Sequence, residues 1–329
     1  MPNEIKVAAT TSLGSWNNWA ITEVEAVFAD HGVKLDSYSK QCAGSAMSYI
    51  WNLIQNTDNF DISKADTSNL FDMVLRCASL KLNASADPQE VYFQMRNKQV
   101  NGQWKKTIEL VINTYGYEAL LRHYGTNVSE VVGPMIVHEG DDFEPPQYIG
   151  FETKPPVWKP KYLSNKAMFV VYLVKLKGKK ETYLISHRES VKKNLKAHVR
   201  NSLMNETFGL VKSRYDANAK QAEEIKQRKN AIMDALNQCE TLDEMLACKE
   251  ARPYMSAAWT DSTEDMIVRK MIKNCVKGFP KDYGDLGKDS INRIEMEADD
   301  AYRTSREEID EHENSEPFII DGEMTEVDG

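Results

Sequence analysis

Four carboxylates that suit metal chemistry lie within six residues of one another, at Glu139, Asp141, Asp142 and Glu144. Clustered carboxylates are the ligands that two-metal cleavage of a phosphodiester bond requires. Because all four fall on one short stretch around Gly140, we expect them to lie on a single turn instead of converging from separate elements. The preferred interpretation has no metal site and no catalytic residue, and a metal-dependent nuclease is the alternative.

Other catalytic patterns do not occur in the chain. The five cysteines form no C-x-x-C pair, and the six histidines lack the spacing of metal ligands. The phosphate-binding loop G-x-x-x-x-G-K-[ST] is also missing, which argues against a nucleotide-driven enzyme. No stretch approaches the eighteen or so apolar residues of a membrane span. We therefore expect a cytoplasmic protein with reduced cysteines.

Charge is distributed very unevenly along the 329 residues, although the net charge is only -9. Residues 295–329 contain 14 acidic residues and two arginines, whereas residues 154–200 contain 13 lysines and arginines and only two glutamates. A dense basic segment is typical of a protein that binds a polyanion such as nucleic acid. The alternative is an ordinary lysine-rich surface in contact with water.

The basic segment contains one row of cations with helical spacing. Ser186 and Glu189 have the spacing of a capping box, which predicts a helix start. Cations then recur every four residues and stay on one side of a helix, beside an apolar line that would dock on a sheet. The cations are Arg188, Lys192, Lys196 and Arg200, and the apolar line is Val191, Leu195 and Val199.

A second helix repeats this design between Thr260 and Lys277. Ile267, Met271 and Cys275 form its apolar line, and Arg269, Lys273 and Lys277 form its cationic line. We predict that the two cationic rows flank one sheet and line a groove for the backbone of a DNA strand. Two amphipathic helices with ordinary wet faces are the alternative.

The remaining pattern predicts an α+β fold, in which a small antiparallel sheet packs with helices. Apolar spacing predicts helices over 16–80, and β-rich segments predict a first hairpin around Asn101-Gly102. Five prolines between Pro145 and Pro160 predict a loop without regular structure. The other expected elements are a helix over 117–124 with a left-handed cap at Gly125, a strand over 131–138, a hairpin formed by 168–177 and 181–185, and a helical stretch over 217–248.

We divide the chain into three parts on this basis: a helical N-terminal region over 1–68, a core over 69–285 with a helical insertion at about 201–252, and an acidic tail over 286–329. A like-charged segment of this composition is expected to be disordered. It would compete with DNA for the basic groove, or simply keep the protein soluble.

The order of several segments resembles the RecT family of phage single-strand DNA-annealing recombinases, from about Asn69 to Pro280. The acidic turn resembles the family's V-x-E-G-D-x-F-E motif. The other matching segments are Val74–Asn83 followed by Glu90–Phe93, Ile185–Glu189, and Trp259 with Asp265–Lys273. Thr114-Tyr115-Gly116 departs from the family's Tyr-Lys-Gly, and His123 stands where the family has arginine, with Arg122 beside it.

The resemblance implies a protein that coats single-stranded DNA, assembles into a homo-oligomer or helical filament, and pairs complementary strands without ATP. Its partners would be single-stranded DNA, the annealed duplex intermediate, further copies of itself, a cognate exonuclease and a host single-strand-binding protein. It would act in the host cell cytoplasm without a cofactor, with Mg²⁺ only modulating annealing. A structural phage protein that assembles without DNA is a third interpretation. The candidate DNA-binding residues are Arg96, Lys105, Lys106, Arg122, His123, Arg188, Lys192, Lys193, Lys196, Arg269, Lys270 and Lys273.

Overall fold

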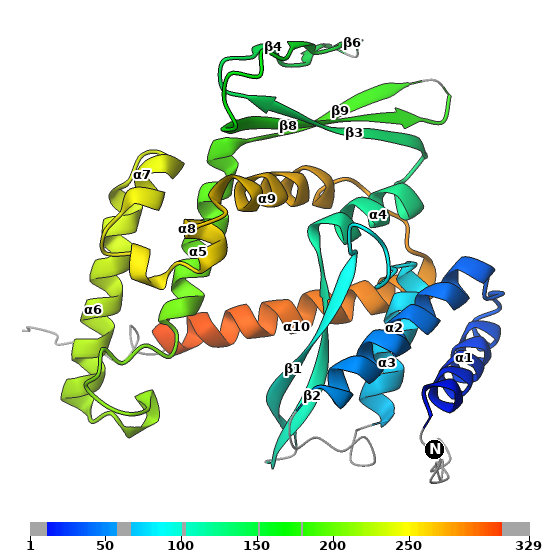
Figure 1. Ribbon diagram of the computed structural model, residues 1–329, viewed down its shortest axis with the longest axis horizontal. Helices are drawn as coiled ribbons and strands as arrows, with labels where there is room; N and C mark the ends of the chain where they lie inside the picture. The colour runs from blue at the N-terminus through cyan, green and yellow to red at the C-terminus, as the bar shows by residue number, and fades with distance from the viewer. Residues whose placement is uncertain (1–11, 58–66, 101–102, 151, 179, 311–329) are drawn as a thin grey trace, which may run out of the picture. The chain divides into compact units, whose positions relative to one another are not determined.

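The computed structural model describes residues 12–57, 67–100, 103–150, 152–178 and 180–310 (Figure 1). The chain divides into two compact units. The first unit comprises Met1–Val191 and Asp261–Met296, and the second comprises Lys192–Thr260 and Glu297–Gly329.

The first unit begins with three helices that pack against a long hairpin. Trp16, Ala20, Val24 and Phe28 recur every four residues and are buried, so α1 presents one apolar face to α2 and α3. The side chain of Asn69 in α3 hydrogen-bonds both the N–H and the C=O of Ile108 and thereby ties α3 to the hairpin. The elements are α1 (Leu13–Asp30), α2 (Ser37–Gln55), α3 (Thr67–Leu80), β1 (Val91–Val100) and β2 (Gln103–Ile112). The predicted helices and hairpin are confirmed, while the turn at Asn101-Gly102 lies outside the described residues.

Helix α4 (Thr114–Tyr124) starts three residues earlier than predicted, because Asn113 caps it by accepting a hydrogen bond from the N–H of Thr114. Gly116 is required in its first turn, since a Cβ there would lie 2.3 Å from the carbonyl oxygen of Glu90. The predicted left-handed cap at Gly125 is wrong, because Gly125 has φ −56°. A Cβ at Gly125 would instead collide with the carbonyl oxygen of Leu121 and the side chain of Val128.

A three-stranded antiparallel sheet follows, in the order β3-β8-β9. Its middle strand β8 carries Val170, Val171 and Tyr172, which are fully buried, so the expectation of cover on both faces is confirmed. Helix α9 packs on one face, and the excursion between β3 and β8 lies on the other (Figure 1). The strands are β3 (Val128–His138), β8 (Ala167–Leu176) and β9 (Glu181–His187).

The excursion over residues 139–166 contains short strands, three of them between Pro145 and Pro160, where a loop or extended connector without regular structure was predicted. Strands of three residues fit between the prolines. Their pairing requires few backbone hydrogen bonds, and none of these has to come from a proline, which has no N–H. β4 (Asp142–Glu144) pairs with β7 (Val157–Lys159), and β5 (Gln147–Ile149) pairs with β6 (Glu152–Lys154).

Helices α9 (Thr263–Lys277) and α10 (Gly284–Asp310) complete the fold of the first unit, to which α10 contributes its first turns up to Met296. Ile267, Met271 and Cys275 are buried as predicted and face β8 and β9. Helix α10 extends to Asp310, beyond the predicted start of the acidic tail, and residues 311–329 lie outside the described residues.

The second unit is a small helical body. Leu195, Val199 and Leu203 form the buried face of α5, and His198 accepts a hydrogen bond from the N–H of Ser256 while contacting the ring of Trp259. Its elements are α5 (Lys192–Leu203), η3 (Arg214–Asp216), α6 (Ala219–Gln238), α7 (Leu242–Ala247), η4 (Arg252–Tyr254) and α8 (Ala257–Thr260).

The predicted helix start at Ser186 is wrong. Strand β9 continues to His187, where it pairs with Phe169, and a 3-10 turn, η2 (Arg188–Val191), comes before the α-helix. The hydroxyl of Ser186 hydrogen-bonds that of Ser190. Arg188 therefore does not belong to a helical row with Lys192, Lys196 and Arg200.

The predicted class is confirmed: helices pack with small antiparallel sheets in an α+β fold. All five cysteines are free thiols. Among the described residues, no helix is both long and apolar enough to cross a membrane.

Candidate nucleic-acid interface

Helix α9 presents a row of cations beside its buried face. Arg269, Lys270, Lys273 and Lys277, here called the α9 row, follow one another at helical spacings. The hydroxyl of Thr114 donates to the carbonyl oxygen of Arg269 at 3.2 Å and helps to hold α9 against α4. Since sheet and α4 both support the helix, the row sits on a rigid element.

The middle of the α9 row is crowded and partly removed from water. The ammonium of Lys273 lies 4.5 Å from the ring centre of Tyr117, and that of Lys277 lies 5.8 Å away. Burial, followed by repulsion from Lys270 and Lys277, lowers the pKa of Lys273 to about 8. Burial and the charge of Arg269 likewise lower the pKa of Lys270. Desolvation and mutual repulsion therefore disfavour the charged form of both lysines.

No ion pair with an acidic side chain involves Lys270 or Lys273 within the described residues. Desolvated cations normally have a counter-charge, so this part of the α9 row is complementary to an anion, and no described residue supplies one through an ion pair. A chain of phosphates along the helix would supply that charge.

Binding of DNA should therefore weaken as pH rises above 8. A phosphate next to Lys273 favours its charged form, so its pKa in the complex returns toward the ordinary value of about 10.4. Between these two pKa values binding takes up a proton, and affinity should fall by up to about tenfold per pH unit. Fluorescence anisotropy with a labelled oligothymidine at constant salt measures this fall.

The matched control is Lys273→Arg, because arginine stays charged throughout this range and should flatten the profile. An unchanged slope in Lys273→Arg would assign the titration to another group.

Lys281 also titrates in this range, because burial lowers its pKa to about 8. Its ammonium donates to the carbonyl oxygens of Val276, Lys277 and Phe279 at the end of α9. Melting temperatures recorded at each pH separate its effect on stability from binding.

Helix α4 holds the two predicted residues Arg122 and His123 in internal contacts. Arg122 donates to the carboxylate of Glu118 and to the carbonyl oxygen of Val131. His123 contacts the rings of Tyr38 and Tyr124, and burial lowers its pKa. A neutral histidine and an arginine that is already hydrogen-bonded within the protein are weak contacts for phosphate. The roles of Arg122 and His123 in DNA binding stay predictions.

Arg188 was predicted to contact DNA, but its side chain is buried and does not face solvent. Its guanidinium donates two parallel hydrogen bonds of 2.8 Å to the carboxylate of Glu264 in the first turn of α9. It also donates to the carbonyl oxygen of Ala167, whose N–H donates to Glu264. Arg188 thus joins β8, η2 and α9 into one body.

The hairpin residues Arg96 and Lys105 have side chains outside the described part of the structure. Strand pairing places Lys105 opposite Lys98, and Lys106 opposite Asn97. Lys106 is exposed on β2. These three residues stay predictions.

The second unit carries its own cationic row on α5. Lys192, Lys193, Lys196 and Arg200 lie beside the buried Leu195 and Val199, and the ammonium of Lys192 donates to the carbonyl oxygen of Glu240 at 2.7 Å. Lys193 is exposed and Lys196 is half-buried. Because this row and the α9 row belong to different units, their convergence on one strand stays a prediction.

The carboxylates of the acidic turn, residues 139–144, make hydrogen bonds and ion pairs that hold the turn against residues 158–166. The carboxylate of Asp141 accepts hydrogen bonds from the N–H of Lys161, the N–H of His138 and the indole of Trp158, and these bonds lower its pKa to about 2. Glu139 and Asp142 pair with Lys166 and Lys161. Within the described residues no group of three or more side chains is arranged to hold a metal ion.

Two features of this surface were not predicted from the sequence: the support of Lys273 by Tyr117, and the pairing of Lys277 with Glu295 at 3.2 Å. Lys277 itself was in the predicted cationic line, so helical spacing in the sequence was sufficient to identify this residue. Its partners, Tyr117 and Glu295, come from two other helices, α4 and α10, which the spacing within α9 does not identify.

These features define an α+β protein in which a helix with a row of partly desolvated cations packs on a small antiparallel sheet. The model of the RecT family matches residues 44–314, most of the chain. The chain belongs to the RecT family. Members of this family are annealing proteins rather than catalytic enzymes in general, so its role is single-strand DNA annealing in recombination, with binding of single-stranded DNA and self-association. No curated protein and no solved structure matches the chain.

Proposed function

We propose that the α9 row holds the sugar-phosphate backbone of single-stranded DNA and leaves the bases exposed for pairing. The observation that carries this proposal is the presence of two desolvated lysines, Lys270 and Lys273, without an internal carboxylate partner among the described residues. Contacts to phosphate alone are independent of base sequence and depend steeply on salt.

Annealing then proceeds without ATP. Base stacking in the product duplex contributes about 1.4 kcal/mol per step, so strand pairing needs no external energy source. The protein neutralises charge and aligns the strands, which lets two polyanions approach each other. Mg²⁺ would only modulate this process by screening phosphates.

The protein acts as a homo-oligomer or helical filament along DNA in the host cell cytoplasm. Subunits placed side by side would continue the cationic surface from one to the next and keep a strand extended. A cognate exonuclease would supply the single strand, and a host single-strand-binding protein would be the competing or delivering partner.

A strand-annealing assay with complementary labelled oligonucleotides, without nucleotide and with or without Mg²⁺, tests this function. Wild type should anneal in all conditions, and both Lys192→Glu and Lys273→Glu should anneal more slowly. Annealing that requires ATP would exclude the mechanism. Native mass spectrometry with and without DNA separates a DNA-dependent assembly from a structural protein that assembles alone.

A further inference from the structure

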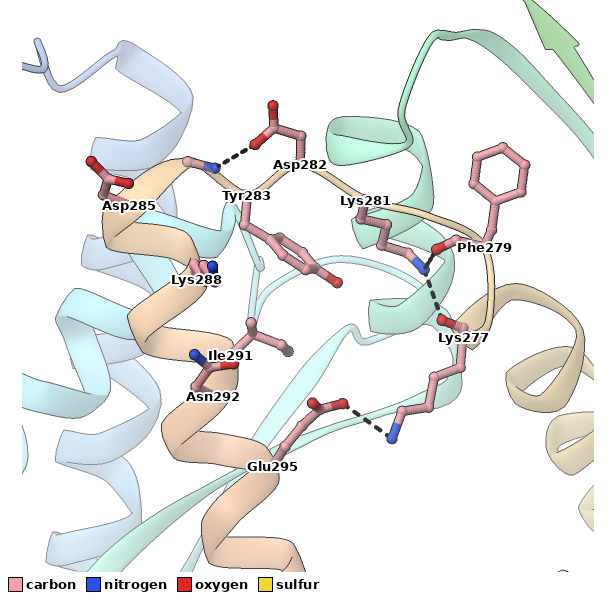
Figure 2. A pocket seen from close by; sticks show the side chains of 11 residues that line it. Lys277, Phe279, Lys281, Asp282, Tyr283, Asp285, Lys288, Ile291, Asn292 and Glu295 are labelled. Carbon is pink, nitrogen blue, oxygen red and sulfur yellow. Dashed lines mark hydrogen bonds and ion pairs between the residues drawn. The ribbon is translucent and has the colours of Figure 1, made fainter.

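A pocket lies where α9 ends and α10 begins, directly beside the α9 row. Its volume is about 550 Å³, and its lining combines apolar side chains with charges of both signs. Figure 2 shows the ring of Tyr283 between α10 and the chain that carries Lys281, with Lys277 and Glu295 facing each other across one side. This is large enough for a phosphate with part of its sugar.

The cations around this pocket are used very differently. Lys281 is committed to the C-terminal end of α9, because its ammonium donates to three backbone carbonyl oxygens. Lys288 projects from α10 and is exposed, and no hydrogen bond or ion pair involves its side chain or that of Asn292 within the described residues. Lys288 and Asn292 therefore offer donors that the fold does not consume, whereas Lys277 is paired with Glu295.

Glu295 occupies the place where an anion would bind. Its carboxylate lies 3.2 Å from the ammonium of Lys277, and both side chains are nearly half exposed. Its charge also acts on Lys273 and on Tyr117. A single glutamate thus stands at the end of a row of cations that otherwise has no counter-charge in the described structure.

We propose that the pocket between α9 and α10 binds a phosphodiester group of the strand held by the α9 row, and that this phosphate replaces the Glu295 carboxylate on Lys277. Lys288 and Asn292 complete the contact. Exchange of one anion for another on an exposed lysine costs little, so Glu295 keeps the cation in place and lowers affinity without blocking the site. The inference rests on the proposed function, because it extends the same surface to a second contact.

Glu295→Gln tests the exchange, and Asp289→Asn is its matched control, since Asp289 is exposed on α10 but does not line the pocket. Anisotropy with a labelled oligothymidine at low salt should show Glu295→Gln binding about threefold to tenfold tighter, the effect of one partly exposed charge. Asp289→Asn should change affinity by less than about twofold. Equal effects of the two variants would overturn the proposal, as would weaker binding by Glu295→Gln.

Lys288→Gln tests the pocket from the opposite side, with Lys34→Gln as the control, because Lys34 is exposed on the connection between α1 and α2 and does not line the pocket. Lys288→Gln should weaken binding about threefold and lower the salt slope, whereas Lys34→Gln should change neither. The gain from Glu295→Gln should disappear in a Lys277→Gln background, because both act on one contact. If Lys288→Gln binds DNA with wild-type affinity, the proposal that this pocket binds a phosphate is wrong.

These outcomes are distinct from failure of the proposed function. If Lys273→Glu binds DNA normally, the α9 row is not the interface. If Lys273→Glu loses binding while Glu295→Gln and Lys288→Gln have the same DNA affinity as their controls, the α9 row remains the proposed interface. Only the proposal about the pocket is then rejected.

Discussion

Replacing Lys273 by glutamate is expected to weaken binding of single-stranded DNA about 30-fold to 100-fold at low salt. A charge-assisted hydrogen bond contributes about 1.5–3 kcal/mol, and each 1.4 kcal/mol corresponds to a tenfold change in affinity. The substitution removes such a bond and adds repulsion of phosphate at the crowded centre of the α9 row, between Lys270 and Lys277. The slope of log affinity against log salt should decrease in magnitude by about 0.7 for each phosphate that the variant no longer neutralises.

Two controls accompany this variant. Lys273→Met keeps the apolar stem over Tyr117 and removes only the charge, so its affinity should fall about tenfold. Lys34→Glu makes the same charge reversal at an exposed lysine that is not part of the α9 row and should bind nearly as wild type. If the two glutamate variants lose affinity equally, net charge and not the α9 row determines binding.

Arg188→Met is expected to give the largest loss of stability, lowering the free energy of unfolding by about 2–4 kcal/mol. Breaking a buried ion pair typically costs about 3–5 kcal/mol, and the expected loss is smaller here because a third of the Glu264 side chain is exposed. The arginine is only 4% exposed, and its removal takes the guanidinium hydrogen bonds away from the carbonyl oxygen of Ala167 and from Glu264, which keeps the N–H of Ala167 as a donor. Urea unfolding measures the change.

The double variant Arg188→Met, Glu264→Leu should recover much of this stability, because an apolar pair leaves no unpaired buried charge. DNA affinity of the folded single variant should stay close to wild type. An Arg188→Met protein with normal stability and impaired DNA binding would show that the arginine contacts DNA after all.

Local sequence patterns were sufficient wherever neighbours along the chain decide the outcome. The spacing of Ile267, Met271 and Cys275 predicted the buried face of α9, and the same periodicity placed Arg269 and Lys273 at its edge. The hairpin of β8 and β9 and the order of the family motifs were likewise visible in the sequence.

Tertiary structure decided the features that depend on distant partners. Periodicity placed Arg188 on an exposed helical row, but pairing of His187 with Phe169 extends β9 and turns the arginine toward Glu264, 76 residues further along. Glu295 reaches Lys277 only because the chain reverses between α9 and α10. A charge is free or paired according to what lies opposite it in space, and spacing along one helix contains no information about the neighbouring element.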